Sequence, residues 1–475
     1  MKNWKRRESF LPVAVLLLLV SLIASACGSG ANTNTAGGAE AANGSPSAAA
    51  GSSTSGADGK KEEKTEKTKV IWWHSMGGEL GKAADQLVAD FNASQDGIEV
   101  EAVYQGTYDE SLNKMKASMD SKSGPSLIQV YEIGSRFMID SGAITPVQDF
   151  IDQEGYDVSQ LEENIASYYT FDGKQYSMPF NTSNPILYYN KDLFKAAGLD
   201  PDKAPATYGE VKQAAQTLAA KGTPASFAIY GWFMEQFFAN QGAEYVNNGN
   251  GRSAPADASL VNGDAGIQTL EWWKEMVDSK AAINLGRKTD DTKKAFLAGQ
   301  ISMTLDSTAS LRGIVDGAAG KFEVGTAFLP KPDGAEGGVV VGGASLWILN
   351  NKPEAEQKAA WEFIKFLAQP ETQAKWHIST GYFPITKQAY DEQIVKENLD
   401  KYPQFQTAID QLHASKPSQA TQGAVMGVFP EARQIVEGAI EEVLGGSKPV
   451  KQALDAAAEA ITGKISNYNK TVNVK

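Results

Sequence analysis

Polar side chains suited to binding a ligand stand at the ends of three strands that the sequence predicts. They lie in the segments Trp73-His74-Ser75, Gly106-Thr107-Tyr108 and Tyr131-Glu132. In open α/β sheets, ligands bind beyond the carboxyl ends of the strands, so these segments are expected to face one site. The chemistry that the sequence suggests first is therefore recognition of a small molecule.

Residues for catalysis or metal binding do not form a known arrangement. His74, His377 and His413 are the three histidines, and none has a metal-binding spacing. The chain has no Gly-x-Ser-x-Gly elbow, no P-loop and no nucleotide fingerprint. Asp109 and Glu132 could supply the carboxylate pair of a glycosidase, but nothing in the sequence favours that. We therefore expect no enzyme, no cofactor and no metal, with a secreted hydrolase as an alternative.

Strands and helices alternate through the chain. Strands at 70–73, 98–104 and 127–130 alternate with helices at 81–92, 108–121 and 136–141. This βαβα order predicts an α/β fold with a mostly parallel sheet and helices on both faces. Later strands are expected at 186–189, 301–305, 322–329 and 339–349. Later helices are expected at 190–197, 208–221, 230–240, 265–278, 291–298, 354–367 and 371–379. The C-terminal part is also expected to be helical, most clearly at 430–444 and 450–468.

The stretch from Met178 to Phe194 organises the chain. Pro179 and Pro185 bracket a polar Asn-Thr-Ser-Asn segment, and an apolar, aromatic run follows. Proline fixes φ and has no N–H to donate, which favours sheet edges and crossings between parts of a fold.

The N-terminus has the features of an export signal. Basic residues precede an apolar run at 11–23, which is too short to span a bilayer comfortably, so residues 1–26 are predicted to be a signal peptide. Ala24, Ser25 and Ala26 come directly before Cys27, the single cysteine, and this resembles a bacterial lipobox. We expect acylation of Cys27, with palmitate among the acyl groups; a buried core cysteine is the alternative.

Composition separates a tether from a folded body. Residues 27–68 are rich in Gly, Ala, Ser, Asn and Thr without a hydrophobic period, so this segment is expected to be a flexible tether. The remaining body, of roughly 400 residues, is long for one core, and two lobes are expected. The net charge of -13 argues against nucleic acid as a partner.

Several segments resemble one family in order. Leu-Tyr-Tyr-Asn-Lys-Asp-x-Phe at 187–194 resembles the first interlobe crossing of the extracellular solute-binding proteins of ABC importers. Segments 73–82, 127–134, 286–288, 342–347 and 376–382 resemble its glycerol-3-phosphate-binding members. The resemblance implies a two-lobed type II periplasmic-binding-protein fold with three crossings, near 180, 327 and 384. Lobe 1 would comprise 69–182 and 327–385, and lobe 2 would comprise 183–326 and 386–475.

The resemblance also implies a set of ligand contacts. Carried over one by one, they are Tyr108, Glu132, Ser183, Ser307, Gly343, Tyr382 and Arg433. Trp232 would cover the carbon face of the ligand. Family members have a second tryptophan three residues before Trp232, where this chain has Ile229, so substituents on the phosphate are left open.

These residue types suit a phosphate ester. A phosphomonoester is close to dianionic at neutral pH, and Arg433 can bind two of its oxygens. Gly343 lets a backbone N–H approach closely, and Glu132 can accept hydrogen bonds from glycerol hydroxyls. Each residue also has a structural alternative. These are packing for the tyrosines, a partly core position for Trp232, turn or cap roles for the serines, strand geometry for Gly343, a surface helix position for Arg433 and an ordinary loop-end charge for Glu132.

The function implied by the resemblance is that of a monomeric lipoprotein on the extracytoplasmic face of a bacterial membrane. It would capture sn-glycerol 3-phosphate between its lobes and deliver it to ABC permease subunits. The sequence does not distinguish glycerophosphodiesters from glycerol 3-phosphate as the ligand. A sugar- or oligosaccharide-binding protein of the same fold is the main alternative.

Overall fold

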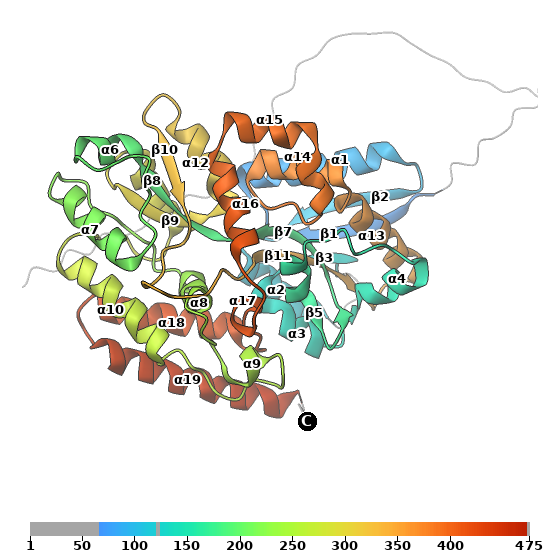
Figure 1. The fold of residues 1–475 in the computed structure, drawn as a ribbon. Helices are drawn as coiled ribbons and strands as arrows, with labels where there is room; N and C mark the ends of the chain where they lie inside the picture. Colours follow the sequence, from blue (N-terminus) through green and yellow to red (C-terminus); the bar gives the residue numbers. More distant parts are fainter. Residues whose placement is uncertain (1–65, 120–123, 473–475) are drawn as a thin grey trace, which may run out of the picture. The chain divides into compact units, whose positions relative to one another are not determined.

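Two β-sheets organise residues 66–119 and 124–472, the part of the chain that the computed structural model describes (Figure 1). The larger sheet has the strand order β2-β1-β3-β11-β4, with β7 also paired to β11. Its strands are β1 (Thr68–His74), β2 (Ile98–Tyr104), β3 (Leu127–Tyr131), β4 (Ile144–Thr145), β7 (Met178–Ser183) and β11 (Gly342–Leu349). The smaller sheet has the order β10-β8-β9, with β8 (Pro185–Asn190), β9 (Met303–Ser307) and β10 (Val324–Ala327). A short hairpin, β5 (Thr170–Phe171) and β6 (Lys174–Gln175), is separate from both.

Strand direction corrects one prediction. β1 runs parallel to both β2 and β3, as the βαβα order predicts. β11 is antiparallel to β3, β4 and β7, and every pair in the smaller sheet is antiparallel. The prediction of a mostly parallel sheet is therefore wrong beyond β1, β2 and β3. β11 arrives from the smaller sheet, so its direction is not set by a crossover between neighbouring strands of the larger sheet, as it is for β1, β2 and β3.

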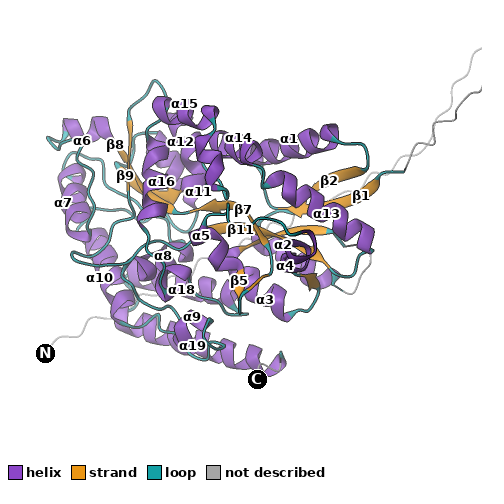
Figure 2. Ribbon diagram, turned by 45° about the vertical axis from the view of Figure 1, so that its right-hand side comes forward, coloured by secondary structure: helices purple, strands orange, loops and turns teal. Residues whose placement is uncertain are grey.

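Helices surround both sheets (Figure 2). Those with predicted counterparts are α1 (Gly78–Ser94), α2 (Tyr108–Ser118), α3 (Ser135–Asp140), α6 (Lys191–Ala196), α7 (Tyr208–Ala219), α8 (Gly231–Asn240), α10 (Asp264–Asp278), α11 (Thr289–Leu297), α13 (Glu354–Leu367), α14 (Pro370–Thr380), α18 (Phe429–Leu444) and α19 (Val450–Thr471). The C-terminal part, predicted to be helical, also contains α15 (Gln393–Lys401), α16 (Gln404–Ala414) and α17 (Gln419–Gln422). Helices that were not predicted are α4 (Val147–Glu154), α5 (Glu163–Ala166), α9 (Asn247–Gly251) and α12 (Leu311–Ala318). The missed helices are mostly short, so few turns carry a periodic pattern.

The chain passes between the sheets at Asn184. β7 ends at Ser183 in the larger sheet, and β8 begins at Pro185 in the smaller one. The Asn184 side chain is buried and its Nδ2 donates to the carbonyl oxygen of Val340 (2.7 Å). Pro179 lies beside a register shift between β7 and β11, a position where a missing N–H is tolerated.

Two further passages connect the lobes built on these sheets. The chain leaves the smaller sheet at the end of β10 and enters the larger one at the start of β11. Near the third predicted crossing, Phe383 N donates to Thr182 O (2.8 Å), next to the end of β7. The fold is therefore two-lobed, with backbone segments from distant parts of the chain side by side between the lobes.

The N-terminal predictions fall largely outside the described residues. Residues 1–65, which include the predicted signal peptide, Cys27 and nearly all of the tether, are not described. Within residues 66–119 and 124–472, no helix has the length and apolar character needed to cross a membrane.

Candidate functional site

A cavity of about 200 Å³ collects all eight predicted ligand contacts. They are Tyr108, Glu132, Ser183, Trp232, Ser307, Gly343, Tyr382 and Arg433. Tyr131, from a strand-end segment that was expected to face the site, also lines the cavity, whereas none of Trp73, His74 and Ser75 does. Six further lining residues were not predicted: Tyr230, Phe233, Thr289, Asp306, Ala309 and Ser310. The structure therefore brings together side chains that lie as far apart in sequence as Tyr108 and Arg433.

Strand ends place several of these groups. Glu132 directly follows β3, Ser183 ends β7 and Ser307 ends β9. Tyr108 begins α2, where Thr107 and Glu110 form a capping box: Glu110 N donates to Thr107 Oγ1 (3.3 Å) and Thr107 N donates to Glu110 Oε2 (2.7 Å). This pair satisfies two backbone donors of the first turn and so defines where the helix starts.

Tyrosines form one wall of the cavity. Tyr108 stacks on Tyr131 with ring centroids 5.3 Å apart, and Asn181 Nδ2 donates to the Tyr108 hydroxyl (2.8 Å). Burial raises the pKa of Tyr108 well above its usual value, so the hydroxyl keeps its proton and can donate a hydrogen bond to a ligand. Tyr382 stacks on Trp376 with centroids 5.5 Å apart. Both tyrosines therefore also pack, and their structural role accompanies their place at the site.

Arg433 is held by two glutamates. Its Nε donates to Glu235 Oε1 (2.8 Å) and its Nη2 donates to Glu235 Oε2 (2.9 Å). Nη2 also donates to Glu132 Oε1 (2.6 Å). The side chains of Arg433 and Glu132 are 7% and 6% exposed, so the expectation of an ordinary surface arginine does not hold. Burial alone would lower the pKa of Arg433. The negative charges of Glu235 and Glu132 outweigh this effect of burial and raise the pKa of Arg433 well above its usual value.

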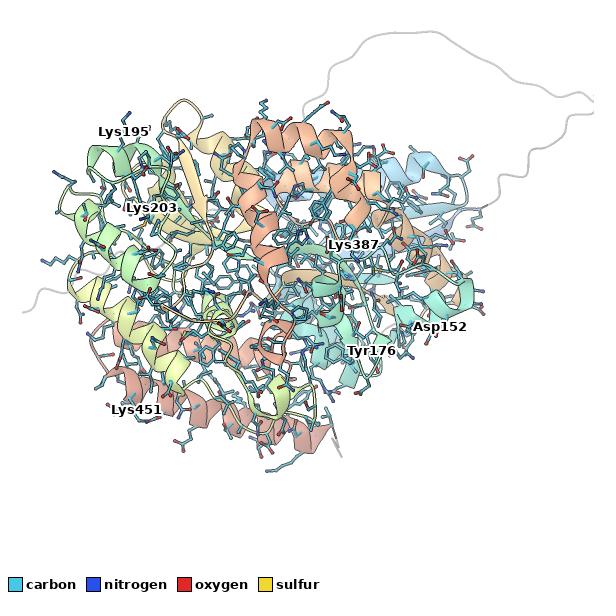
Figure 3. All side chains as sticks on the ribbon, in the orientation of Figure 1. Asp152, Tyr176, Lys195, Lys203, Lys387 and Lys451 are labelled. Carbon is cyan, nitrogen blue, oxygen red and sulfur yellow. The ribbon has the colours of Figure 1, made fainter. Side chains whose placement is uncertain are left out.

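This arrangement leaves part of the guanidinium for a ligand. An arginine has five N–H donors, and the bonds to Glu235 and Glu132 use those of Nε and Nη2. Nη1 carries the other two donors. Arg433 is the only basic side chain that lines the cavity in the described part of the chain. The exposed Lys195 and Lys451 project from the periphery of α6 and α19 (Figure 3) and do not reach it.

A close helix contact fixes the position of Arg433. Gly231 begins α8, and a Cβ there would lie 2.5 Å from Cγ of Arg433 on α18. Gly231 N donates to Glu437 Oε1 (3.0 Å), which places a carboxylate of α18 at the N-terminus of α8. The missing side chain of Gly231 therefore lets the two helices approach, and Arg433 and Glu235 meet between them.

Two adjacent glycines shape the opposite side. A Cβ on Gly342 would lie 2.3 Å from the Trp232 ring, so this glycine makes room for the indole. Gly343 has φ +95°, and its Cβ would lie 1.8 Å from the carbonyl oxygen of Asn181. The backbone geometry of the sheet therefore requires glycine at position 343 whether or not a ligand binds there. This agrees with the alternative that Gly343 serves strand geometry. Trp232 Nε1 is buried and has no hydrogen-bond partner among the described residues.

The end of β9 supplies a serine and a carboxylate. Ser307 Oγ accepts from Ala309 N (3.1 Å), so it acts as a cap while its own hydrogen remains available to donate. Asp306 Oδ1 accepts from Ser307 N (2.7 Å). Burial raises the pKa of Asp306 to about 6, with Lys293 opposing the shift. In the sequence, Asp306 directly precedes Ser307, which was a predicted contact. That position next to Ser307 could have identified Asp306 as a residue of the site.

A larger groove of about 680 Å³ lies elsewhere and contains none of the predicted contacts. Its half-buried arginine, Arg252, donates to the carbonyl oxygens of Gly423 (2.7 Å) and Gln422 (2.7 Å). Those donors are therefore used to hold backbone. In the described residues no cluster of His, Cys, Asp and Glu could hold a metal ion.

Comparison with known proteins places this geometry in a family. Residues 86–407 match the model of the bacterial extracellular solute-binding protein family. The sn-glycerol-3-phosphate-binding periplasmic protein UgpB of Escherichia coli strain K12 is 35% identical over 414 residues, which cover 85% of this chain and 94% of that protein.

Two solved structures share the fold. UgpB of Mycobacterium tuberculosis, solved in complex with glycerophosphocholine, is 23% identical with a TM-score of 0.74, over 84% of this chain and 99% of its own. The cyclic α-maltosyl-1,6-maltose-binding protein of Arthrobacter globiformis is 25% identical with a TM-score of 0.69. The match covers 85% of this chain and 100% of that protein's chain. At these levels of identity the structures support the two-lobed fold, whereas the ligands named in their descriptions are diverse.

Proposed function

This chain belongs to the bacterial extracellular solute-binding proteins, and we propose that it captures sn-glycerol 3-phosphate for delivery to an ABC permease. One observation carries the proposal. Among residues 66–119 and 124–472, Arg433 is the only cation at a cavity otherwise lined largely by hydroxyl and aromatic groups, a composition suited to one phosphate and a short polyol. The 35% identity to a glycerol-3-phosphate-binding protein supports the same choice.

The size of the cavity favours a small ligand. Pockets for drug-sized ligands measure about 300–1,000 Å³, whereas this cavity measures about 200 Å³. An oligosaccharide would need more space. A sugar remains the second candidate, because Tyr108, Tyr230 and Trp232 are aromatic side chains suited to pack on a sugar ring.

Glycerophosphodiesters remain within the proposed ligand class. Ile229, at the place of the second tryptophan of the family, is fully buried and does not line the cavity. Tyr230 and Trp232 form that wall instead, with ring centroids 5.9 Å apart. A substituent on the phosphate would therefore meet a different wall from that of family members with two tryptophans.

Binding is proposed to close the two lobes without any chemical change to the ligand. We place lobe 1 at 69–182 and 327–385 and lobe 2 at 183–326 and 386–475. Glu132 then belongs to lobe 1 and Arg433 to lobe 2, so a ligand between them makes its full set of contacts only when the lobes are together. Only such a difference in affinity between two conformations can shift their populations.

Solution scattering tests this proposal. With saturating glycerol 3-phosphate, the radius of gyration should fall, and the ligand should be recovered unchanged. A radius that stays the same at saturation would contradict capture by closure. Release of inorganic phosphate would show that the protein is an enzyme.

The mature protein is proposed to be a monomeric lipoprotein anchored outside the cytoplasm through Cys27. Replacing Cys27 with Ser should release the protein from the membrane fraction, because the acylated cysteine is the proposed anchor and two acyl chains are needed for stable anchoring. Immunoblots of membrane and soluble fractions measure this. A Ser25→Thr variant, which keeps the cysteine, serves as the control. Full membrane retention of the Cys27→Ser variant would argue for another anchor.

A further inference from the structure

Glu235 is a buried carboxyl group that the proposed function leaves without a role. It lies on α8, its side chain is 10% exposed, and it accepts hydrogen bonds from both Nε and Nη2 of Arg433. It does not line the ligand cavity but a separate void of about 10 Å³. Glu235 therefore acts on a ligand only through Arg433.

The groups that face Glu235 carry more negative than positive charge. They come from α18, from the turn after β3, from the segment before β5, from the residue before α8, and from the segment between α8 and α9. They are Arg433, Glu437, Glu132, Tyr168, Tyr230 and Tyr245. Arg433 is the one cation among them. Glu437 accepts from Gly231 N and also pairs with Arg287 (3.1 Å), so its charge is already compensated.

A dianionic ligand would unbalance this cluster. Arg433 with ionised Glu132 and Glu235 carries one net negative charge, since one cation faces two carboxylates. A phosphomonoester adds close to two more negative charges at neutral pH. Water screens little of the repulsion, because all three side chains are at least nine-tenths buried. Neutralising one carboxylate lowers the net negative charge of the liganded cluster from about three to about two and so reduces this penalty.

Resting on the proposed function, we infer that Glu235 is a positioning residue that holds Arg433 and takes up one proton when a phosphate binds to that arginine. A protonated carboxyl still has an oxygen that accepts from Arg433 Nε, so the arginine stays in place. Glu132 is less suited to this role, because it lines the cavity and can turn its carboxylate to the hydroxyls of the ligand.

The titration of Glu235 gives the expected pH dependence. Burial raises its pKa to about 7; Arg433 opposes the shift, and Glu132 adds to it. A bound anion raises this pKa further. Above pH 7, binding therefore needs proton uptake, and affinity should fall by up to about tenfold per pH unit. Below pH 7, Glu235 is already protonated and adds no further pH dependence.

Calorimetric titration with glycerol 3-phosphate tests the inference. At about pH 8, titrations in buffers of different ionisation enthalpy should show uptake of about one proton per ligand by the wild-type protein. Glu235→Gln, which resembles the protonated carboxyl, should take up none and should bind about tenfold more tightly than wild type at that pH. Asp306→Asn is the comparison variant, because Asp306 is the other buried carboxyl with a raised pKa beside the cavity. It should keep the proton uptake.

Each other outcome has one meaning. Binding by wild type without proton uptake would overturn the inference even if Glu235→Gln fails to fold. Uptake that persists in Glu235→Gln would assign the proton to the ligand or to another residue, and uptake that is lost only in Asp306→Asn would assign it to Asp306. If wild type does not bind glycerol 3-phosphate at all, the proposed function fails first.

Discussion

Replacing Arg433 with alanine should weaken glycerol 3-phosphate binding by about 2–5 kcal/mol, from roughly thirtyfold to several thousandfold in Kd. The reason is that Arg433 is the only basic side chain lining the cavity in the described part of the chain. Lysine would keep the charge but not the planar fork that Glu235 holds, so recovery should be partial. Calorimetry on the purified variants measures the change.

The same substitution should also reduce stability. Removing one partner of a buried ion pair costs about 3–5 kcal/mol, because the remaining charge is buried without compensation. Here two carboxylates, on Glu132 and Glu235, would remain. Urea unfolding of Arg433→Ala measures this cost independently of ligand.

Arg287 offers a matched control for both effects. It pairs with two glutamates of the same helix, Glu437 (3.1 Å) and Glu441 (2.6 Å), but it is 39% exposed and does not line the cavity. Arg287→Ala should cost only about 0–1 kcal/mol of stability. Its affinity should match wild type below pH 7, where Glu235 is already protonated and the charge of Glu437 beside it matters least. If Arg433→Ala binds as tightly as wild type, Arg433 is not part of the site.

Replacing Trp232 with alanine should have the second large effect. Its ring is 5% exposed and fills the space left by the missing side chain of Gly342, so truncation should cost about 3–5 kcal/mol of stability. It should also weaken ligand binding, because the indole forms a wall of the cavity. Unfolding and titration experiments on the same preparation separate the two effects.

Trp273 is the control for this prediction. It lies on α10, is 1% exposed, packs on Phe227 and does not line the cavity. Trp273→Ala should lose a similar amount of stability and keep the wild-type affinity at temperatures where it is folded. Equal losses of affinity in the two variants would mean that Trp232 acts only through stability.

Sequence patterns predicted the elements better than their arrangement. Sequence patterns placed helices such as α13, whose observed bounds, Glu354–Leu367, match the prediction, and strands such as β2. Strand direction was not accessible in this way, because an apolar run such as β11 has the same pattern whether it pairs in parallel or antiparallel. The prolines at 179 and 185 did indicate the first crossing, since their chemistry limits where they can stand in a sheet.

The site shows a similar limit. The strand-end argument alone brought Tyr108 and Glu132 towards one edge of the larger sheet, and the family resemblance added the contacts from the smaller-sheet lobe. Neither pointed to Glu235, because its pairing with Arg433 joins residues 198 positions apart and depends on how closely α8 and α18 pack. The small size of Gly231 permits that contact, and a sequence shows such a glycine only as a residue near a helix start.

The proposed function requires that the cavity around Arg433 recognises a small phosphate ester. Calorimetric titration of the wild-type protein with glycerol 3-phosphate, with glycerophosphocholine and with maltose measures this recognition. We expect saturable binding of glycerol 3-phosphate, with or without binding of the diester, and no binding of maltose. Binding of maltose without binding of either phosphate ester would contradict it and support the sugar-binding alternative.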